Sequence, residues 1–385
     1  MNLNSVFSER FGGAPSFSLR SPGRVNLIGE HVDYNDGFVL PIAVSMQTDL
    51  CVRARDDNRV VLYSPLFDSQ LEFSLDDLTK QNAWIDYAQA VASVWQNEGL
   101  ETRGFEGVVS SDVPLASGLS SSASFEVAVA LAFLQLTGQQ KSRADIALLC
   151  QRAENQFIGV NSGIMDQMAV IACQKDHALL LDCRDLNLRQ VPFVLKDHCL
   201  VVIDSAAPRE LASSAYNERR MQCEQGLALL QKWYPEAKSL RDISPDQFAL
   251  HSKELPEVVG RRIAHVVGEI ARTLEAVAAL EAGDLAKFGR KMNESHASLR
   301  DLYGVTSMEL DFLTDWARKQ PGVLGSRMTG AGFGGCTVTL IERDKAGDFI
   351  ERLKRDYEVA TNRHARGWVC EAEAGAEILS SENNP

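Results

Sequence analysis

Stretches with a strand pattern alternate along this chain with stretches that have a helix pattern, and this alternation limits the possible folds most strongly. β-Branched and apolar residues concentrate at residues 48–54, 60–63, 178–181, 199–203 and 336–341. Helix-like patterns cover residues 121–136, 142–157, 218–233, 255–282 and 309–318. The order predicts an α/β or α+β architecture.

The length of the chain favours two domains, because 385 residues exceed what one compact core usually holds. Continuity is weakest around residues 193–198, where a polar turn follows a predicted strand. We therefore predict an N-terminal domain over residues 1–195 and a C-terminal domain over residues 196–385.

The formal charge of −13 argues against partners that reward a basic surface, namely nucleic acids and anionic membranes. The apolar run at residues 123–136 contains Glu126 and is too short to span a bilayer, so it predicts a buried helix. No signal peptide is visible, and the eight cysteines form no Cys-x-x-Cys pair, which favours buried free thiols. We expect a cytoplasmic protein with small-molecule partners and no obligate protein partner.

A serine-rich loop at residues 114–124 leads directly into the predicted buried helix. Unpaired amides and the positive end of the helix dipole suit a phosphate group, and small side chains allow its close approach. A serine cap for the helix is an equally ordinary explanation. The loop lacks the G-x-x-x-x-G-K-[ST] pattern, which excludes a P-loop NTPase.

A glycine-rich loop at residues 330–335 matches G-x-G-x-x-G literally, but its context is wrong for a dinucleotide site. Such a fingerprint follows a strand and opens a helix, whereas residues 336–341 alternate like a strand. A tight glycine turn beside a ligand, or a simple hairpin, fits better.

A charge-dense segment at residues 22–37 combines an Arg, a Glu, a His and an Asp within ten positions and has little regular periodicity. Carboxylates and an imidazole are groups that hydrogen-bond sugar hydroxyls. A solvated surface loop is the alternative for any one of these residues, although it explains the whole cluster poorly.

In order and character, these three loops resemble the motifs of the GHMP kinases, the superfamily of galactokinase, homoserine kinase, mevalonate kinase and phosphomevalonate kinase. Residues 24–33 resemble the signature of the galactokinase branch, and the similarity continues through residues 163–167, 216–220 and 295–301. The resemblance implies an α+β fold of two domains, with an N-terminal ribosomal-S5-like domain and a C-terminal ferredoxin-like domain. It implies an active site in the cleft between the domains.

The resemblance also implies ATP-dependent phosphorylation of the C1 hydroxyl of α-D-galactose, with Mg²⁺, and a role for each matching residue. Asp166 and Arg24 form the catalytic pair, with Arg24 keeping Asp166 ionised. The expected sugar contacts are Glu30, His31, Val32, Asp33, Gly163 and Tyr216. The expected nucleotide contacts are Ser64, Trp84, Ala116, Ser117, Gly118, Leu119, Ser120, Ser121, Ser122, Gly330 and Gly332. Ser122 and Glu154 are the expected Mg²⁺ ligands.

Each of these assignments has a plainer alternative. Asp166 could be a surface carboxylate, Glu154 a solvated helix end, Trp84 a core anchor and Tyr216 a helix cap. The sequence also departs from the family at residues 206–209, where an alanine pair, a proline and an arginine replace an Asn and a basic-His pair. The departure keeps open a kinase for N-acetylgalactosamine or arabinose. A catalytically inactive galactose sensor is the alternative from another class of protein.

Overall fold

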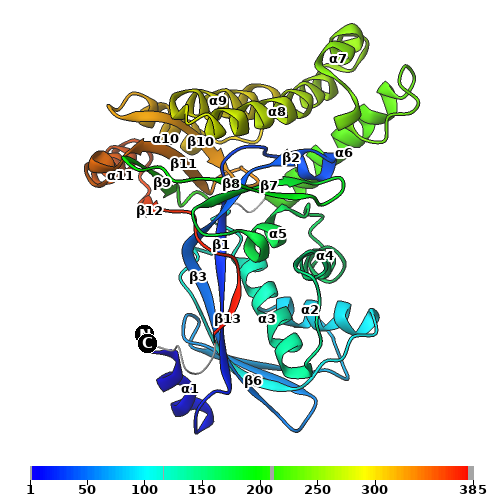
Figure 1. Ribbon diagram of the computed structural model, residues 1–385, viewed down its shortest axis with the longest axis vertical. Helices are drawn as coiled ribbons and strands as arrows, with labels where there is room; N and C mark the ends of the chain where they lie inside the picture. Colours follow the sequence, from blue (N-terminus) through cyan, green and yellow to red (C-terminus); the bar gives the residue numbers. More distant parts are fainter. Residues whose placement is uncertain (1, 116, 209–211, 380–385) are drawn as a thin grey trace.

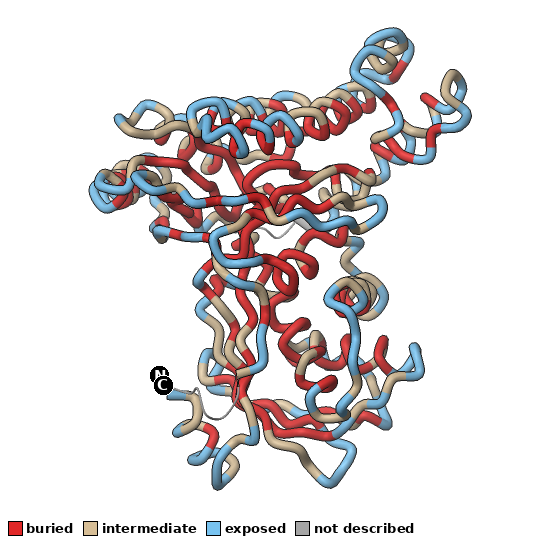
Figure 2. Tube along the Cα trace, viewed as in Figure 1, coloured by how far each residue is buried: buried red, intermediate tan, exposed pale blue. Residues whose placement is uncertain are grey.

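The computed structural model describes residues 2–115, 117–208 and 212–379. Figure 1 shows a lower part, built on one tall sheet with helices along one side, and a broader upper part where long helices cover a second sheet. Buried residues, red in Figure 2, run along the inner strands of the lower part and continue into the upper sheets.

The lower part is built on a six-stranded sheet with the order β13-β1-β3-β6-β4-β5. Its strands are β1 (Phe17–Asn26), β3 (Pro41–Ala54), β4 (Arg59–Ser64), β5 (Ser69–Ser74), β6 (Phe105–Ser111) and β13 (Glu377–Leu379). The pairing of β1 with β3 is antiparallel and shifts register between Pro22 and Arg24. At this bulge the Arg24 amide donates to the Leu119 carbonyl (3.1 Å), so the irregularity joins β1 to the serine-rich loop.

Helices cover one face of this sheet, and one short helix packs on the other face. One face carries α2 (Asp86–Asn97), α3 (Ser121–Thr137), α4 (Arg143–Ala153) and α5 (Met165–Ala172). Helix α3 is apolar on nearly every side and lies among α2, α4, α5 and the sheet, as expected for a fully buried helix. The short helix α1 (Leu3–Phe11) packs Phe7 against Cys51 and Val108 elsewhere on the sheet.

The upper part contains a four-stranded antiparallel sheet with the order β10-β11-β9-β12. Its strands are β9 (His198–Asp204), β10 (Val323–Thr329), β11 (Cys336–Glu342) and β12 (Arg366–Cys370). Alternate residues of β9 face opposite helix layers: Leu200 and Val202 pack with residues of α8 (Glu257–Glu281) and α9 (Leu285–Ser298), whereas Val201 packs with α10 (Met308–Arg318) and α11 (Ala346–Thr361).

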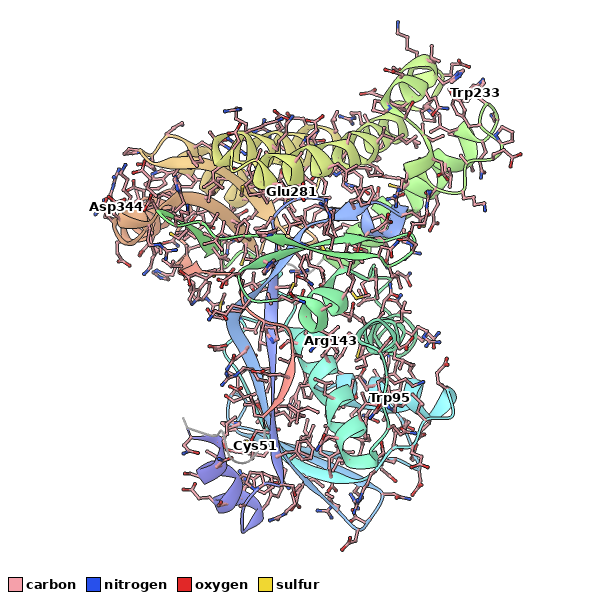
Figure 3. The ribbon with its side chains drawn as sticks, in the orientation of Figure 1. Cys51, Trp95, Arg143, Trp233, Glu281 and Asp344 are labelled. Carbon is pink, nitrogen blue, oxygen red and sulfur yellow. The ribbon has the colours of Figure 1, made fainter. Side chains whose placement is uncertain are left out.

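A three-stranded sheet, β2-β7-β8, lies where the two parts meet. Its strands are β2 (Phe38–Val39), β7 (His177–Asp182) and β8 (Leu188–Pro192). Helices α6 (Ala212–Leu230) and α7 (Pro245–His251) belong to a lobe whose outer tip carries Trp233 (Figure 3). The short helical turns are η1 (Asp33–Asn35), η2 (Glu154–Ile158), η3 (Leu240–Asp242), η4 (Ser252–Glu254), η5 (Leu299–Tyr303) and η6 (Arg343–Lys345).

Each predicted strand and helix is present, with ends shifted by a few residues in most cases and strand β3 extended further at its start. One expectation was wrong in part: residues 22–37 are not irregular throughout, because β1 includes residues up to Asn26 and carries Arg24. The domain boundary at residue 195 remains a prediction. Strand β13, from the end of the chain, pairs with β1 in the lower sheet. No helix within the described residues is long and apolar enough to cross a membrane.

Candidate active site

Arg24 and Asp166 form an ion pair at the junction of β1 and the N-terminus of α5. Nε and Nη2 of Arg24 both donate to Asp166 Oδ1, at 2.9 and 2.6 Å. The Arg24 side chain is 4% exposed and that of Asp166 is 27% exposed, so only the carboxylate is open to a ligand. Burial alone would lower the pKa of Arg24, but the charges of Asp166 and Glu30 outweigh it and raise that pKa. The guanidinium therefore stays charged.

The serine-rich loop closes on this ion pair. Ser120, at the N-cap of α3, has a left-handed backbone, and its hydroxyl donates to Asp166 Oδ2 (2.5 Å) instead of capping the helix. Arg24 Nη1 donates to the Gly118 carbonyl (2.5 Å). The first amides of α3 therefore lack a side-chain cap and remain suited to an anion. Ala116, which was predicted to belong to this loop, lies outside the described residues.

Glu154 lies where α4 continues as the π-helical turn η2, a form of helix that is frequent at functional sites. Its carboxylate accepts hydrogen bonds from Ser122 (3.2 Å), Ser162 (2.7 Å) and Gln167 (3.0 Å). Burial raises the pKa of Glu154. Within the described ranges, no group of three or more His, Cys, Asp or Glu side chains could hold a metal ion. A metal between Ser122 and Glu154 would need further oxygen ligands from a substrate or from water.

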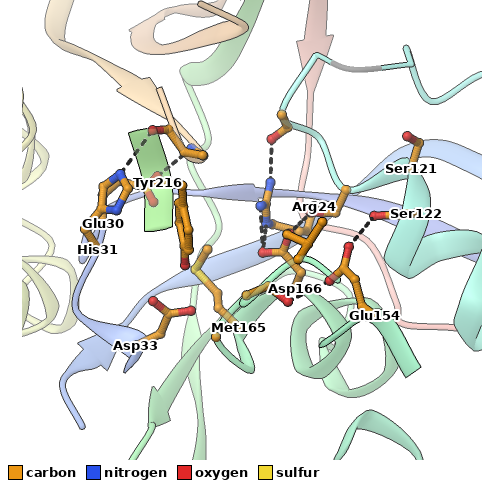
Figure 4. Close-up of a pocket in the computed structure, with 17 residues that line it drawn as sticks. Arg24, Glu30, His31, Asp33, Ser121, Ser122, Glu154, Met165, Asp166 and Tyr216 are labelled. Carbon is orange, nitrogen blue, oxygen red and sulfur yellow. Dashed lines mark hydrogen bonds and ion pairs between the residues drawn. The ribbon is translucent and has the colours of Figure 1, made fainter. Parts of the chain in front are cut away.

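The charge-dense segment brings Glu30, His31 and Asp33 to the same region as Gly163 and Tyr216 (Figure 4). A Cβ placed on Gly163 would lie 1.8 Å from Asp33 Oδ2, so the absence of a side chain at Gly163 gives this carboxylate its place. Burial, followed by the charges of Asp166 and Glu30, raises the pKa of Asp33 to about 7. Burial also raises the pKa of Glu30, against the charges of Arg327 and Arg24.

These residues enclose a cavity of about 270 Å³, which we call the polar cavity. It is lined by Arg24, Glu30, His31, Asp33, Gly118, Ser120, Ser121, Ser122, Glu154, Val160, Ser162, Gly163, Met165, Asp166, Tyr216, Gly330 and Ala331. The lining comes from both parts of the fold, because Tyr216, Gly330 and Ala331 follow strand β9 in the chain.

A second cavity of about 370 Å³, the aromatic cavity, adjoins the first at Ser121 and Ser122, which line both. It is lined by Thr48, Ser64, Leu66, Phe67, Trp84, Tyr87, Val109, Ser111, Leu115, Ser121, Ser122 and Phe125. The rings of Phe67 and Trp84 are stacked with centroids 6.0 Å apart. Predicted residues Ser64 and Trp84 therefore line the same cavity, whereas Asp166 lines the other one.

Among the described residues that we predicted, Val32, Ser117, Leu119 and Gly332 line neither cavity. Val32 is buried in the core, and the Ser117 hydroxyl donates to the Pro114 carbonyl (2.7 Å). The sequence interpretation missed several lining residues, among them Met165, Ala331, Phe67, Tyr87 and Phe125. Met165 and Ala331 lie inside motifs that were already recognised, whereas the aromatic residues carry no signal that separates them from core packing.

Three family models match the chain. The galactokinase galactose-binding signature matches residues 5–54, the GHMP kinases N terminal domain matches residues 86–174, and the GHMP kinases C terminal domain matches residues 276–359. The chain is 48% identical over 385 residues to a galactokinase from Roseiflexus sp. (strain RS-1), covering 100% of this chain and 98% of the relative. It is 43% identical over 379 residues to a galactokinase from Chloroflexus aggregans, covering 98% and 97%.

A solved structure agrees with these matches. The crystal structure of Lactococcus lactis galactokinase complexed with galactose superimposes with a TM-score of 0.93 at 38% identity, covering 97% of this chain and 98% of that one. The fold and the site thus define a small-molecule kinase of the GHMP class, and the predicted α+β fold of two GHMP kinase domains is confirmed. Within that class, the chain belongs to the galactokinase family.

Proposed function

We propose that this protein transfers the γ-phosphoryl group of ATP to the C1 hydroxyl of α-D-galactose, forming galactose 1-phosphate and ADP. The observation that carries the proposal is the Arg24–Asp166 ion pair, which faces the polar cavity between the serine-rich loop and the charge-dense segment (Figure 4). The resemblance to galactokinases, one of them described as complexed with galactose, supports galactose as the sugar.

Asp166 is suited to receive the hydroxyl proton. Two nitrogens of Arg24 and the Ser120 hydroxyl already donate to its carboxylate. An ionised carboxylate has roughly four lone-pair positions, so about one remains for a sugar hydroxyl. As the C1 oxygen attacks the γ-phosphorus, Asp166 takes the proton and the bond to the bridging oxygen of ADP breaks. Arg24 offsets the negative charge near the transferred group.

The aromatic cavity is suited to the adenine base, since Trp84 and Phe67 offer flat apolar surfaces for stacking. The amides that begin α3 lie between the two cavities and are suited to the phosphates. We propose that ATP lies across Ser121 and Ser122, which line both cavities, with its terminal phosphate directed toward Asp166.

We propose Ser122 and Glu154 as the ligands of Mg²⁺. A hydroxyl and a carboxylate oxygen already lie 3.2 Å apart there, and such oxygens, together with phosphate oxygens and water, are the ligands that Mg²⁺ prefers. When bound, the ion would neutralise charge on the β- and γ-phosphates. Gln167 and Ser162 hold the second carboxylate oxygen of Glu154 and so fix its direction.

The sugar contacts that we propose are Glu30, Asp33, Gly163 and Tyr216. Among the residues that depart from the family, Ala206, Ala207 and Pro208 do not line the polar cavity, and residues 209–211 lie outside the described part of the chain. We further propose that the reaction takes place in the cytoplasm, where ATP is available and free cysteines stay reduced. We also propose that the reaction needs no obligate protein partner.

The test is ADP release by the purified protein with Mg·ATP and a panel of substrates: galactose, N-acetylgalactosamine, 2-deoxygalactose, glucose, arabinose and mevalonate. We expect turnover on galactose well above the others. Preferred turnover of another sugar would refute galactose as the substrate and retain the phosphoryl transfer. Galactose binding without turnover of any substrate would overturn the proposal in favour of a sensor.

A further inference from the structure

Both ring nitrogens of His31 have partners within the protein. Nε2 lies 3.1 Å from the carbonyl oxygen of Ala331, in the glycine-rich loop (Figure 4). Nδ1 lies 2.8 Å from the Tyr34 hydroxyl. The Tyr34 hydroxyl lies 2.8 Å from that of Tyr303, which lies 3.1 Å from Cys223 Sγ. One chain of contacts therefore runs from the glycine-rich loop through His31 to helix α6.

The Ala331 carbonyl fixes the direction of every hydrogen bond in this chain. A carbonyl oxygen only accepts, so Nε2 carries the proton and, in a neutral ring, Nδ1 accepts. The Tyr34 hydroxyl then donates to Nδ1 and must accept from Tyr303. The Tyr303 hydroxyl therefore donates to Tyr34 and accepts from the Cys223 thiol. Burial, and then the nearby His265, lowers the pKa of His31 to about 3, which agrees with a neutral ring.

Glu30, the residue before His31, also contacts the glycine-rich loop. Glu30 Oε1 accepts from the Gly330 amide (2.8 Å), so Glu30 and His31 bind consecutive residues of the glycine-rich loop. Gly330 in turn lies against the serine-rich loop, since a Cβ placed on it would be 2.9 Å from the Gly118 carbonyl oxygen. If the Gly330–Ala331 segment shifted, it would press on the serine-rich loop, to which we assign the phosphates.

We infer that His31 is a positioning residue: as the neutral tautomer with the proton on Nε2, it holds the glycine-rich loop against the phosphate-binding loop. The Ala331 carbonyl selects this tautomer, and the Tyr34 hydroxyl supports it by donating to Nδ1. The family signature points to His31 as a sugar contact, but with both nitrogens occupied the ring has no hydrogen bond left for a hydroxyl. His31 has a left-handed backbone (φ 60°), which is uncommon for a residue other than glycine.

The tautomer can be measured directly by NMR on the full chain labelled with ¹⁵N-histidine. The protein has seven histidines, and the His31 signals are identified as those that disappear in His31→Asn. Asn is chosen because it tolerates the left-handed backbone of residue 31. We expect Nε2 to be protonated and Nδ1 bare in the wild type. Tyr34→Phe removes the donor to Nδ1, but both Tyr34→Phe and Tyr303→Phe should keep Nε2 protonated, because the Ala331 carbonyl still accepts from it. A protonated Nδ1 in the wild type would overturn the inference.

Binding supplies the second readout, with Mg²⁺ and the non-hydrolysable nucleotide AMP-PNP as the probe. Loss of one buried hydrogen bond should weaken nucleotide binding about fivefold in Tyr34→Phe and galactose binding by less than about twofold. Tyr234→Phe is the matched control, since it loses one hydrogen bond to the Gln247 carbonyl in the outer lobe. Weakened galactose binding with unchanged nucleotide binding would show His31 to be a sugar contact and overturn the inference.

The kinetic importance of His31 rests on the proposed phosphoryl transfer, but neither measurement needs turnover. A protein that fails the ADP assay and still shows the protonated Nε2, with weaker AMP-PNP binding in Tyr34→Phe, would overturn the proposed function and support the positioning role. Normal ADP release together with a protonated Nδ1 would support the proposed function and overturn the positioning role of His31.

Discussion

The two adjoining cavities are built by opposite means. Among its described residues, the polar cavity is lined by seven charged or titratable side chains, which are mostly buried and fixed by hydrogen bonds, as the Arg24–Asp166 and Glu30–Gly330 contacts illustrate. The aromatic cavity has no charged side chain among its described lining residues. Phe67 and Leu115, at its mouth, are 45% and 48% exposed.

This difference separates two tasks. Buried charges are costly to gather, but once paired they hold reacting groups in one geometry. Apolar packing is less directional and tolerates entry and exit of a ligand, and a flat stacking surface needs little fixed geometry. We therefore expect substitutions in the polar cavity to act on turnover and sugar binding, and substitutions in the aromatic cavity to act on nucleotide affinity.

The largest effect should come from Asp166→Asn, which keeps the shape of the side chain but cannot take a proton. We expect kcat to fall about 10³-fold, which corresponds to about 4 kcal/mol in the activation barrier, while galactose still binds. ADP release and galactose titration measure the two properties. Asp176→Asn is the control, because Asp176 is exposed and lines neither cavity. A kcat near that of the wild type would remove Asp166 from the mechanism.

The next largest effect is expected for Gly163→Ala. The new methyl group would displace the Asp33 carboxylate, and a misplacement of about 1 Å can reduce activity about 10²-fold. We expect kcat/KM for galactose to fall by about that factor, with the KM for ATP nearly unchanged. Gly347→Ala is the matched control, since a methyl group there meets nothing within 4 Å. Equal losses for galactose and ATP would break the separation between the cavities.

A smaller effect is expected for Glu154→Gln, which removes the proposed carboxylate ligand of Mg²⁺ and keeps its volume. The Mg²⁺ concentration at half-maximal rate should rise at least about tenfold, with galactose binding unchanged. Magnesium titrations of ADP release measure this. Glu98→Gln removes an exposed carboxylate paired with Arg152 and should leave the titration unchanged. An unchanged magnesium dependence in Glu154→Gln would contradict the proposed ligand.

In the aromatic cavity, Trp84→Ala should raise the KM for ATP about tenfold through lost base stacking, with kcat and galactose affinity nearly unchanged. Trp233→Ala is the control: Trp233 stacks on His251 in the outer lobe and lines neither cavity (Figure 3). A fall in kcat without a change in the KM for ATP would show that the aromatic cavity does more than bind the base.

The sequence predicts the polar cavity well because its residues occur in compact motifs with unusual chemistry. Arg24, Glu30 and Asp33 lie within ten positions, and the serine-rich loop is continuous. The aromatic cavity gathers residues from β3, β4, α2, β6 and α3, and Phe67, Tyr87 and Phe125 could equally be core residues. Their common function depends on tertiary packing, which the sequence of one chain does not reveal.

The fold shows a similar contrast. Segments α3 and β9 follow from pattern alone, because burial on all sides leaves a continuous apolar run, and β11 follows from its alternation. Strand β10 escaped prediction because polar residues fill its buried positions. Ser326 bonds to Thr339 and Arg327 to the Asn26 carbonyl, partners that only the folded chain brings near.

The last prediction concerns folding stability rather than turnover: Asp33→Asn isolates the stability cost of the polar cavity. The pKa of Asp33 is raised to about 7 in the folded protein, from a usual value of 3.8, so the folded state binds the proton more tightly. Stability from this group is complete below about pH 4 and falls as the pH rises to about 7. The Asn variant lacks this loss and should be more stable than the wild type at pH 8 by up to about 4 kcal/mol, with little gain at pH 4.

Urea denaturation at the two pH values measures this difference, with Asp176→Asn as the control that should show no pH-dependent gain. We also expect galactose to bind more weakly to Asp33→Asn at pH 8, because a neutral amide accepts hydrogen bonds less strongly than a carboxylate. Greater stability joined to weaker sugar binding would mark Asp33 as a carboxylate kept for function at the expense of folding. An equal stability change at pH 4 and pH 8 would mean that the ionised Asp33 carboxylate does not destabilise the folded protein.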